Sequence, residues 1–397
     1  MKYVILVGDG MCDYPIAELG NKTPLESAKT PNMDFLVRNG KLGLARTIPD
    51  GMPAASDVAN LAIFGYDPRV YYSGRGPLEA ANLGIRLEPD DVIFRCNLIT
   101  VSLGKLIDYS AGHISTKEAS VLITFLDEKL GSSEVRFYPG VSYRHLAVLK
   151  NKALKARCIP PHDITGKEFK KYLPRGADAR FLLSLMEQAH KILPEHEINQ
   201  VRVDLKENPA NMIWLWGQGK KPTLLSFKDK YGISGSVISA VDLIKGIGRL
   251  SGLEIINVQG ATGYYDTNYK GKAQAALASL ETKDLVYVHV EAPDEASHNG
   301  DLQQKILAIE RFDQLVVGTI LEALKDKQDF RILLLPDHAT PLSLRTHTAD
   351  SVCFAMYGKG ISTNGLEGFN EQAAKKSGIF LENASVLMDR LIREEEI

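Results

Sequence analysis

Cysteine is scarce in this sequence of 397 residues. The four cysteines are Cys12, Cys96, Cys158 and Cys353, and no two of them form a CxxC pair. A disulfide framework needs several cysteines at regular spacings, and a thiolate zinc site needs them in close pairs. The cysteine pattern therefore excludes both a disulfide framework and a thiolate zinc site.

Long hydrophobic runs are missing as well. No stretch approaches the roughly 18 apolar residues that a membrane-spanning helix requires. The apolar start at residues 3–7 is too short for the hydrophobic region of a signal peptide. We therefore expect a soluble, cytoplasmic protein with no signal peptide and no membrane partner.

An excess of charge of one sign is also absent. Lys and Arg number 47 and Asp and Glu number 49, so the formal net charge is −2. Nucleic-acid-binding domains carry a basic excess, and we therefore expect no nucleic-acid partner. Hydrophobic residues make up 44% of the chain and low-complexity tracts are lacking, which argues against disorder. At roughly 150 residues per domain, the length predicts two or three domains.

Short apolar runs alternate with helical periodicity along much of the chain. The runs predict strands at residues 3–7, 212–216, 285–290 and 332–335, and the periodicity predicts helices at 236–247 and 303–324. Runs that are apolar at every position are typical of strands buried on both faces. The alternation therefore predicts an α/β fold with a doubly wound, mostly parallel sheet, in which ligands gather at the carboxyl ends of the strands.

The middle of the chain has a different pattern. It predicts short strands at 92–101, 106–109, 135–138 and 143–149, with helices at 116–130 and 177–193. This pattern is typical of a smaller α+β domain inserted into the larger one. We place the larger domain at residues 1–80 and 195–397, and the inserted domain at residues 81–194.

Acids and histidines gather where the predicted strands end. These candidates are Asp9, Asp294, His298, Asp337, His338 and His347. Asp294 and His298 are four residues apart, so on one helical turn they would face the same way. Asp337 and His338 come directly after the run at 332–335 and its Pro336. Oxygen and nitrogen ligands without sulfur favour Mn²⁺, Zn²⁺ or Mg²⁺. Two metals about 4 Å apart are the usual device for phosphoryl transfer.

Ser56 is the candidate nucleophile. It follows Pro53-Ala54-Ala55 and precedes a helical pattern, so we expect it at a helix N-terminus. The free N–H groups and the positive dipole end of a helix favour a phosphoryl group at that position. Serine is also a preferred N-cap with no chemistry at all. Beside a metal its hydroxyl would become a nucleophile, and the metal cluster leads us to the second interpretation.

A series of short motifs runs in order along nearly the whole chain. They include Gly8-Asp9-Gly10, Thr23-Pro24-Leu25-Glu26, Gly65-Tyr66-Asp67-Pro68, Gly74-Arg75-Gly76-Pro77, Trp214-Leu215-Trp216-Gly217, Asp294 to His298, and Asp337-His338. Together these motifs resemble the cofactor-independent phosphoglycerate mutases of the archaeal type, within the alkaline phosphatase superfamily. The resemblance implies an alkaline-phosphatase-like fold with an inserted domain that grips the substrate.

The resemblance also implies two divalent metal ions. The implied ligands are Asp294, His298 and His347 for one metal, and Asp9, Ser56, Asp337 and His338 for the other. Mn²⁺ is the metal that the resemblance favours, with Mg²⁺, Co²⁺ or Zn²⁺ as alternatives. No 2,3-bisphosphoglycerate would be needed.

The reaction implied is that of an isomerase of glycolysis and gluconeogenesis. Ser56 would take the phosphoryl group of 3-phosphoglycerate and return it to the 2-hydroxyl of glycerate. The partner is thus a small phosphorylated substrate, and the oligomeric state is not indicated. His113 matches the family's substrate-contacting histidine. Arg144 and Arg75 are further candidates for substrate binding, because a guanidinium pairs with a carboxylate through two hydrogen bonds.

Two departures from the family pattern leave the phosphoryl acceptor open. The mutases commonly have Pro-Gly-Ser-Asp-Thr around the nucleophile, whereas residues 53–58 are Pro-Ala-Ala-Ser-Asp-Val. The run Gly112-His113-Ile114-Ser115 resembles a bacterial branch proposed to act as homoserine kinases. The alternatives are therefore an ATP-dependent homoserine kinase of threonine biosynthesis and a metal-dependent phosphomonoesterase. A GxxxxGK[ST] run is missing, but this fold would not need one for ATP.

Overall fold

The structure is a computed structural model that describes residues 1–393. The chain divides into two compact units. The first comprises Met1–Tyr72 and the chain from Thr223 onward, and the second comprises Ser73–Pro222. Each unit has its own sheet and its own hydrophobic core. The second unit thus interrupts the first in sequence.

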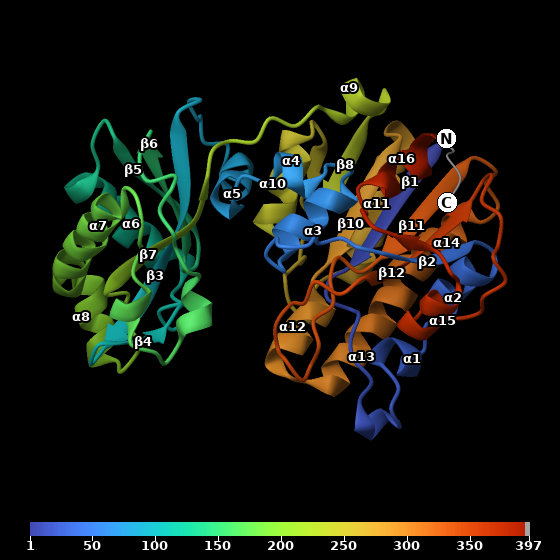
Figure 1. Cartoon of the computed structure of the whole chain (residues 1–397), viewed down its shortest axis with the longest axis horizontal. Coiled ribbons are helices and arrows are strands. Elements are labelled where there is room, and N and C mark those ends of the chain that lie inside the picture. The colour runs from blue at the N-terminus through green and yellow to red at the C-terminus, as the bar shows by residue number, and fades with distance from the viewer. Residues whose placement is uncertain (394–397) are drawn as a thin grey trace. The chain divides into compact units, whose positions relative to one another are not determined.

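An eight-stranded sheet forms the centre of the first unit (Figure 1). Its strands are β1 (Lys2–Gly8), β2 (Lys41–Ala45), β8 (Gly235–Ile238), β9 (Glu254–Ile256), β10 (Leu285–Val290), β11 (Phe330–Leu335), β12 (Val352–Gly358) and β13 (Phe380–Leu381). They lie in the order β13-β2-β12-β11-β1-β10-β8-β9. The β12 strand is antiparallel to both of its neighbours, and the other pairings are parallel. The predicted mostly parallel sheet of an α/β protein is therefore confirmed.

Helices connect the strands of this sheet. They are η1 (Ala17–Leu19), α1 (Pro24–Ser27), α2 (Pro31–Arg38), α3 (Ser56–Ile63), α4 (Pro68–Tyr71), α9 (Phe227–Tyr231), α10 (Asp242–Leu250), α11 (Tyr269–Thr282), α12 (Ala292–Asn299), α13 (Leu302–Arg311), the π-helical η5 (Phe312–Val317), α14 (Gly318–Leu324), α15 (Glu371–Lys376) and α16 (Val386–Arg393). The helix predicted at 303–324 is confirmed as the continuous run α13-η5-α14. The helix predicted at 236–247 is wrong at its start, because residues up to Ile238 form β8.

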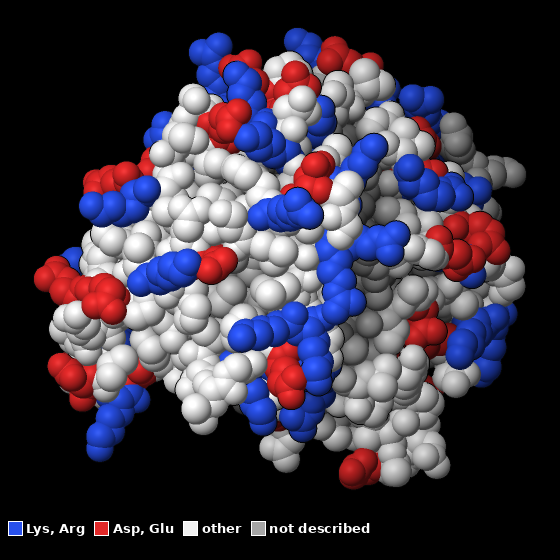
Figure 2. Space-filling model, turned by 60° about the vertical axis from the view of Figure 1, so that its left-hand side comes forward, with Lys and Arg blue, Asp and Glu red and all other residues white. Residues whose placement is uncertain are grey.

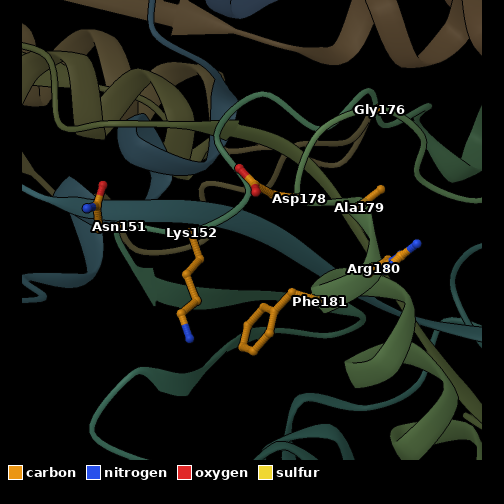
Figure 3. A pocket seen from close by; sticks show the side chains of 7 residues that line it. All are labelled: Asn151, Lys152, Gly176, Asp178, Ala179, Arg180 and Phe181. Carbon is orange, nitrogen blue, oxygen red and sulfur yellow. The ribbon is translucent and has the colours of Figure 1, made fainter.

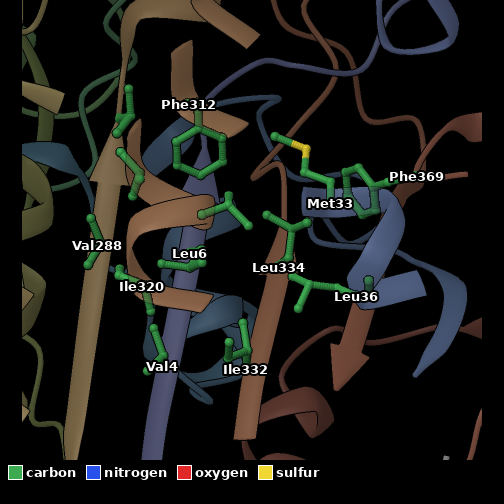
Figure 4. Packing of buried hydrophobic residues seen from close by; sticks show 14 of the residues in the cluster. Val4, Leu6, Met33, Leu36, Val288, Phe312, Ile320, Ile332, Leu334 and Phe369 are labelled. Carbon is green, nitrogen blue, oxygen red and sulfur yellow. The ribbon is translucent and has the colours of Figure 1, made fainter. Parts of the chain in front are cut away.

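Both faces of the sheet are covered, which explains why its central strands are mostly apolar. Val4 and Leu6 of β1 face a cluster that includes Phe312 of η5 and Ile320 of α14 (Figure 4). On the opposite face the ring of Tyr287 stacks on Phe64, with ring centroids 4.1 Å apart. A strand buried on two sides has no position for a solvated side chain, so its polar residues collect at its ends.

The second unit is built on a five-stranded sheet. Its strands are β3 (Asp91–Ser102), β4 (Lys105–Asp108), β5 (Val135–Val141), β6 (Arg144–Lys150) and β7 (Met212–Gly219), and its helices are α5 (Arg75–Leu83), α6 (Thr116–Leu130), η2 (Pro161–Ile164), η3 (Phe169–Tyr172), α7 (Ala179–Ile192), η4 (Leu193–Glu195) and α8 (Glu197–Asp204). All its strand pairings are antiparallel. The strands and the two helices predicted for this region are thus present.

One predicted strand belongs to the other sheet. The apolar run at 212–216 forms β7, but β7 pairs with β3 inside the second unit rather than with the parallel sheet. Its tryptophans are core residues there, with Trp214 fully buried and Trp216 7% exposed. The predicted assignment of residues 195–222 to the larger domain is therefore wrong, and residues 73–80 also lie in the second unit.

Charges of both signs are interspersed on the surface that Figure 2 shows, in keeping with the net charge of −2. Within residues 1–393, every helix is too short or too polar to cross a membrane.

Candidate active site

The carboxyl ends of three adjacent strands meet at one edge of the parallel sheet. The strand β1 lies between β11 and β10, and in the two ladders Val7 is opposite Leu335 and Gly8 is opposite Val290. Asp9 follows β1 directly, Asp337 and His338 follow β11, and α12 with Asp294 follows β10. The sheet therefore brings together acids that are more than 280 residues apart in the sequence.

Gly10 lets the chain turn tightly at this edge. Its φ of +63° lies in the left-handed region, and its N–H donates to Asp337 Oδ1 at 3.2 Å. A Cβ atom at this position would lie 2.6 Å from Asp294 Oδ1 and 2.7 Å from Thr340 Oγ1. Both the conformation and the close approach require glycine.

Three of the predicted ligands form a first group, two of them on α12 and one in the loop after β11. His298 Nε2 lies 3.1 Å from Asp294 Oδ2, and His347 Nε2 lies 3.6 Å from Asp294 Oδ1. The two imidazole Nε2 atoms are 2.9 Å apart. All three side chains thus converge on one point, and they are the three that the family resemblance implies for one metal.

The other predicted ligands form a second group beside the first. His338 Nε2 lies 3.4 Å from both Asp9 Oδ1 and Asp337 Oδ2. Ser56 Oγ lies 3.0 Å from the same nitrogen. Asp9, Asp337 and His338 are almost completely buried. The sequence prediction that these four residues lie together agrees with this geometry.

Ser56 is the first residue of α3, not its cap. The N-cap is Ala55, an extended residue that has no side-chain oxygen with which to accept from the helix. The Ser56 hydroxyl points instead to His338. Asn60, one turn later on α3, donates to Ser56 O at 2.9 Å and to Asp337 Oδ2 at 2.8 Å. The helix that carries the serine is therefore tied directly to the acid cluster.

The acids of the site perturb one another strongly. Burial, together with the carboxylates of Asp337 and Asp294, raises the pKa of Asp9 well above its ordinary value. Burial also raises the pKa of Asp337. Asp294 is buried too, but His347 and His298 lower its pKa well below the ordinary value. Two neighbouring buried carboxylates therefore lack enough positive charge from the protein itself.

These residues fit divalent cations. Asp9 Oδ1 is buried without a hydrogen-bond partner in residues 1–393, and neither ring nitrogen of His289 makes a hydrogen bond there. The donor set of carboxylates, imidazoles and one hydroxyl suits Mn²⁺, Zn²⁺ or Mg²⁺. A cation at Asp9 and Asp337 would satisfy the unpaired oxygen and neutralise the repelling carboxylates.

Three residues of this site escaped the sequence prediction. They are Asn60, His289 and Thr340. His289 lies inside β10 with Nε2 3.3 Å from Asp9 Oδ2, and its signal was an imidazole in an otherwise apolar strand. Asn60 could have been found from its spacing of four residues after Ser56 on a helix. Thr340 carries no signal beyond its nearness to His338.

The candidate substrate-binding residues lie in the second unit. Arg75 Nε and Arg95 Nη1 both donate to Glu79 Oε1, at 2.9 and 2.8 Å. The charge of Arg144 also acts on this carboxyl group. One carboxylate oxygen therefore accepts from two guanidinium groups, and the charge of a third acts on the same carboxyl group.

Tyr143 connects Arg144 with His113. The Arg144 guanidinium lies 5.5 Å from the centre of the tyrosine ring, and the His113 ring lies 6.2 Å from it, edge to face. His113 is exposed and has a φ of +50°. A non-glycine residue in the left-handed region is strained, and such strain is often found at functional sites.

A hollow of about 460 Å³ lies elsewhere in the second unit, and its lining contains none of the predicted substrate-binding residues. It is lined by Asn151, Lys152, Gly176, Asp178, Ala179, Arg180 and Phe181 (Figure 3). The Lys152 ammonium lies 4.6 Å from the centre of the Phe181 ring. The ammonium group of Lys152 therefore already has a partner within the hollow. We assign the hollow no role in the chemistry of the candidate active site.

Known proteins resemble this chain over its full length. A sequence model of the family described as 2,3-bisphosphoglycerate-independent phosphoglycerate mutase matches residues 37–199. A protein of Methanosarcina barkeri with that name is 53% identical over 396 residues, which cover 99% of this chain and 100% of the relative. In Geobacter sulfurreducens, a protein named as a probable enzyme of this kind is 50% identical over 397 residues, covering 99% of this chain and 100% of the relative.

A solved structure agrees with these sequence matches. The cofactor-independent phosphoglycerate mutase of Thermoplasma acidophilum has a TM-score of 0.64 and 27% identity, and the match covers 99% of both chains.

The buried carboxylates lead to a prediction about Asp9→Asn. Without metal, the variant removes one of two repelling charges, and we expect its free energy of unfolding to rise by about 1 kcal/mol or more. Mn²⁺ should stabilise the wild type strongly and the variant weakly, because the cation loses a charged ligand. Thermal unfolding with EDTA and with Mn²⁺, and calorimetric metal stoichiometry, would measure both effects.

The exposed Asp326→Asn is the matched control, and it should change neither quantity. A metal-free Asp9→Asn protein less stable than the wild type, or one that binds two ions as tightly as the wild type, would contradict the assignment.

The arginine cluster predicts a pH dependence for Glu79. Burial alone would raise the pKa of Glu79, but Arg95 and Arg75 lower it below the ordinary value. A lowered carboxyl pKa contributes stability above the ordinary pKa, and this is lost as the pH falls through the folded-state pKa. Glu79→Gln should therefore cost about 3 kcal/mol at pH 7 and progressively less below pH ~4.5.

Urea unfolding at a series of pH values would test this, with the exposed Glu128→Gln as control. If the stabilities of Glu79→Gln and the wild type stay parallel across the acidic range, the carboxylate does not act as described.

Proposed function

Because the chain belongs to the family of 2,3-bisphosphoglycerate-independent phosphoglycerate mutases, we propose that it interconverts 3-phosphoglycerate and 2-phosphoglycerate through a phosphoserine at Ser56. The observation that carries the proposal is the position of Ser56 Oγ. It lies 3.0 Å from His338 Nε2, at the edge of a buried cluster of acids and imidazoles. The enzyme is accordingly an isomerase, and its family needs no 2,3-bisphosphoglycerate.

Two divalent cations complete the proposed site, with Mn²⁺ as the first candidate. The ligands are Asp294, His298 and His347 for one ion, and Asp9, Ser56, Asp337 and His338 for the other. When bound, the ions supply positive charge that stabilises the attacking and leaving oxygens of phosphoryl transfer. The convergence of these side chains in two adjacent groups supports this assignment.

The serine provides the covalent step. In the first half-reaction, Ser56 Oγ bonds to phosphorus while the bond from phosphorus to the 3-oxygen of the substrate breaks. Ser56 loses one proton in this step, and the 3-oxygen that leaves phosphorus gains one to become a hydroxyl group. In the second half-reaction the 2-hydroxyl of glycerate attacks the phosphoserine, and Ser56 regains its proton.

The N-terminus of α3 supports a phosphoryl group at this serine. Ser56 lies in the first turn, and the N-cap Ala55 has no side-chain oxygen for the N–H groups there, of which that of Val58 donates to Asp57 Oδ1 at 3.0 Å. Such N–H groups and the dipole of the helix favour an anion. Asn60 holds the turn in place through Ser56 O and Asp337 Oδ2. The serine is therefore positioned before the substrate arrives.

The charged end of the substrate is proposed to bind the second unit. Arg75 and Arg144 would pair with its carboxylate, and His113 would contact its phosphoryl group. The arginines near Glu79 support this, since Arg75 and Arg95 donate to one oxygen of its carboxylate and the charge of Arg144 acts on the same group. A guanidinium offers the planar pair of donors that a carboxylate accepts.

The Ser56→Ala variant tests the reaction and its covalent step together. Wild-type protein with Mn²⁺ should form 2-phosphoglycerate from 3-phosphoglycerate, and should retain a phosphoryl group on Ser56 when quenched and analysed by mass spectrometry. The variant should lose both signals, with activity at least about 10⁴-fold lower, because a nucleophile has been removed. Ser27→Ala is the control, since the Ser27 hydroxyl has no hydrogen-bond partner in residues 1–393.

The same assay separates this proposal from its alternatives. Phosphohomoserine formed from homoserine and ATP, without 2-phosphoglycerate, would replace the mutase by a kinase. Steady release of inorganic phosphate from 3-phosphoglycerate would indicate a phosphomonoesterase.

Arg144→Gln tests the substrate contact. A lost charge-assisted pair should raise KM for 3-phosphoglycerate about 10-fold or more and change kcat much less, because binding is lost equally in the ground state and the transition state. Arg86→Gln, whose side chain is 94% exposed, is the matched control. An unchanged KM in Arg144→Gln would exclude this arginine from the substrate contact.

A further inference from the structure

Thr340 lies between the two groups of candidate metal ligands. Its side chain is completely buried, two residues after His338. The hydroxyl Oγ1 lies 2.6 Å from Asp294 Oδ1 and 3.1 Å from His338 Nδ1. Asp294 belongs to one ligand group and His338 to the other. A single hydroxyl therefore contacts both groups.

The proton of this hydroxyl fixes the direction of both hydrogen bonds. The 2.6 Å contact is a hydrogen bond that the Thr340 hydroxyl donates to Asp294 Oδ1, because a carboxylate oxygen accepts. The hydroxyl then has no proton left for the imidazole of His338. The ring must donate instead, and Nδ1 of His338 carries a hydrogen.

The other ring nitrogen faces the chemistry. His338 is fully buried, and burial disfavours an imidazole that is protonated on both nitrogens. With the hydrogen on Nδ1, the neutral ring has a free lone pair on Nε2. That atom lies 3.0 Å from Ser56 Oγ and 3.4 Å from Asp9 Oδ1. A lone pair at this nitrogen is what a metal ligand must present.

The backbone of Thr340 is held from both sides. Its N–H donates to Cys12 O at 3.1 Å, and its carbonyl accepts from Lys305 Nζ at 3.0 Å. Lys305 is fully buried and forms an ion pair of 2.7 Å with Asp13. These contacts fasten the loop after β11 to the loop after β1. The threonine hydroxyl therefore cannot move away from its two partners without breaking buried contacts.

We propose that Thr340 is a positioning residue that selects the Nδ1–H tautomer of His338 and thereby presents Nε2 to Ser56 and to a divalent cation. The inference rests on the proposed function for the role of that cation. The same hydroxyl joins His338 to Asp294, so the two ligand groups are oriented together. Loss of the hydroxyl would leave the tautomer unselected and the ring free to rotate.

Thr340→Val and Thr340→Ser separate the hydroxyl from the shape of the side chain. Valine keeps the volume of threonine and removes the hydroxyl, whereas serine keeps the hydroxyl. Thr47→Val is the matched control, because Thr47 is equally buried and its hydroxyl has no partner in residues 1–393. Circular dichroism would confirm folding, and Thr340→Ala replaces the valine variant if that one does not fold.

The first readout is the tautomer of His338 in metal-free protein. Nitrogen-15 NMR of histidine-labelled protein distinguishes a ring nitrogen that carries hydrogen from one that does not, and the spectrum of His338→Gln identifies the signal. We expect the Nδ1–H tautomer in the wild type, Thr340→Ser and Thr47→Val. In Thr340→Val the signal should move toward the Nε2–H tautomer.

The second readout is the affinity for Mn²⁺ by calorimetry. Loss of a partner that orients a ligand typically weakens metal binding about 10–100-fold. We expect this loss in Thr340→Val, with recovery in Thr340→Ser and no change in Thr47→Val. The kcat should fall with the affinity, whereas KM for 3-phosphoglycerate should stay near that of the wild type.

A Thr340→Val protein that keeps both the Nδ1–H tautomer and wild-type Mn²⁺ affinity would overturn the inference. Failure of the proposed function has a different result. The wild type would then lack mutase activity while the NMR signal of His338 still depended on the hydroxyl of residue 340.

Discussion

The first unit is organised around buried negative charge at one edge of its sheet. The strands β11, β1 and β10 lie side by side in parallel, so the residues that follow their carboxyl ends lie close together. Asp9 and Asp337 are both acids, and burial raises the pKa of each. Such a site is unfavourable without a cation, and it gains stability from any divalent ion that it binds. The proposed affinity for metal and the free-energy cost of burying these acids thus follow from the same placement.

The surrounding contacts show how the fold tolerates this charge. Backbone N–H groups of Gly10 and His338 donate to Asp337 Oδ1, and Asn60 donates to its other oxygen. Lys305 carries the opposite charge nearby, but its ammonium group forms an ion pair with Asp13. The protein therefore surrounds Asp337 with hydrogen-bond donors, while the lysine pairs with a different acid. A lysine in direct contact would neutralise the site and leave less need for a metal.

Sequence reasoning selected the candidate ligands because of where strands end, and it failed where contacts depend on folding. Asp9, Asp294, Asp337 and His338 were predicted from polar residues that follow apolar runs, and the geometry of parallel strands brings them together. The run at 212–216 was misassigned, because an apolar strand buried on both faces has the same pattern in either sheet. Thr340 and Asp294 are 46 residues apart in the sequence, so no local pattern predicts the hydrogen bond between them. His289 lay inside a run counted as apolar, so its imidazole passed unnoticed.

The second unit uses charge in the opposite sense. Arg75 and Arg95 share one oxygen of Glu79, and this arrangement keeps two guanidinium groups close together. Guanidinium groups offer paired donors to anions, whereas the acid cluster of the first unit offers oxygen ligands to cations. The formal charge of −2 therefore gives no sign of how the acids of the first unit and these arginines of the second are grouped. An anionic substrate would pair with the arginines of the second unit, and divalent cations would neutralise the acids of the first. Because one unit is inserted into the other in sequence, a single chain contains both groups.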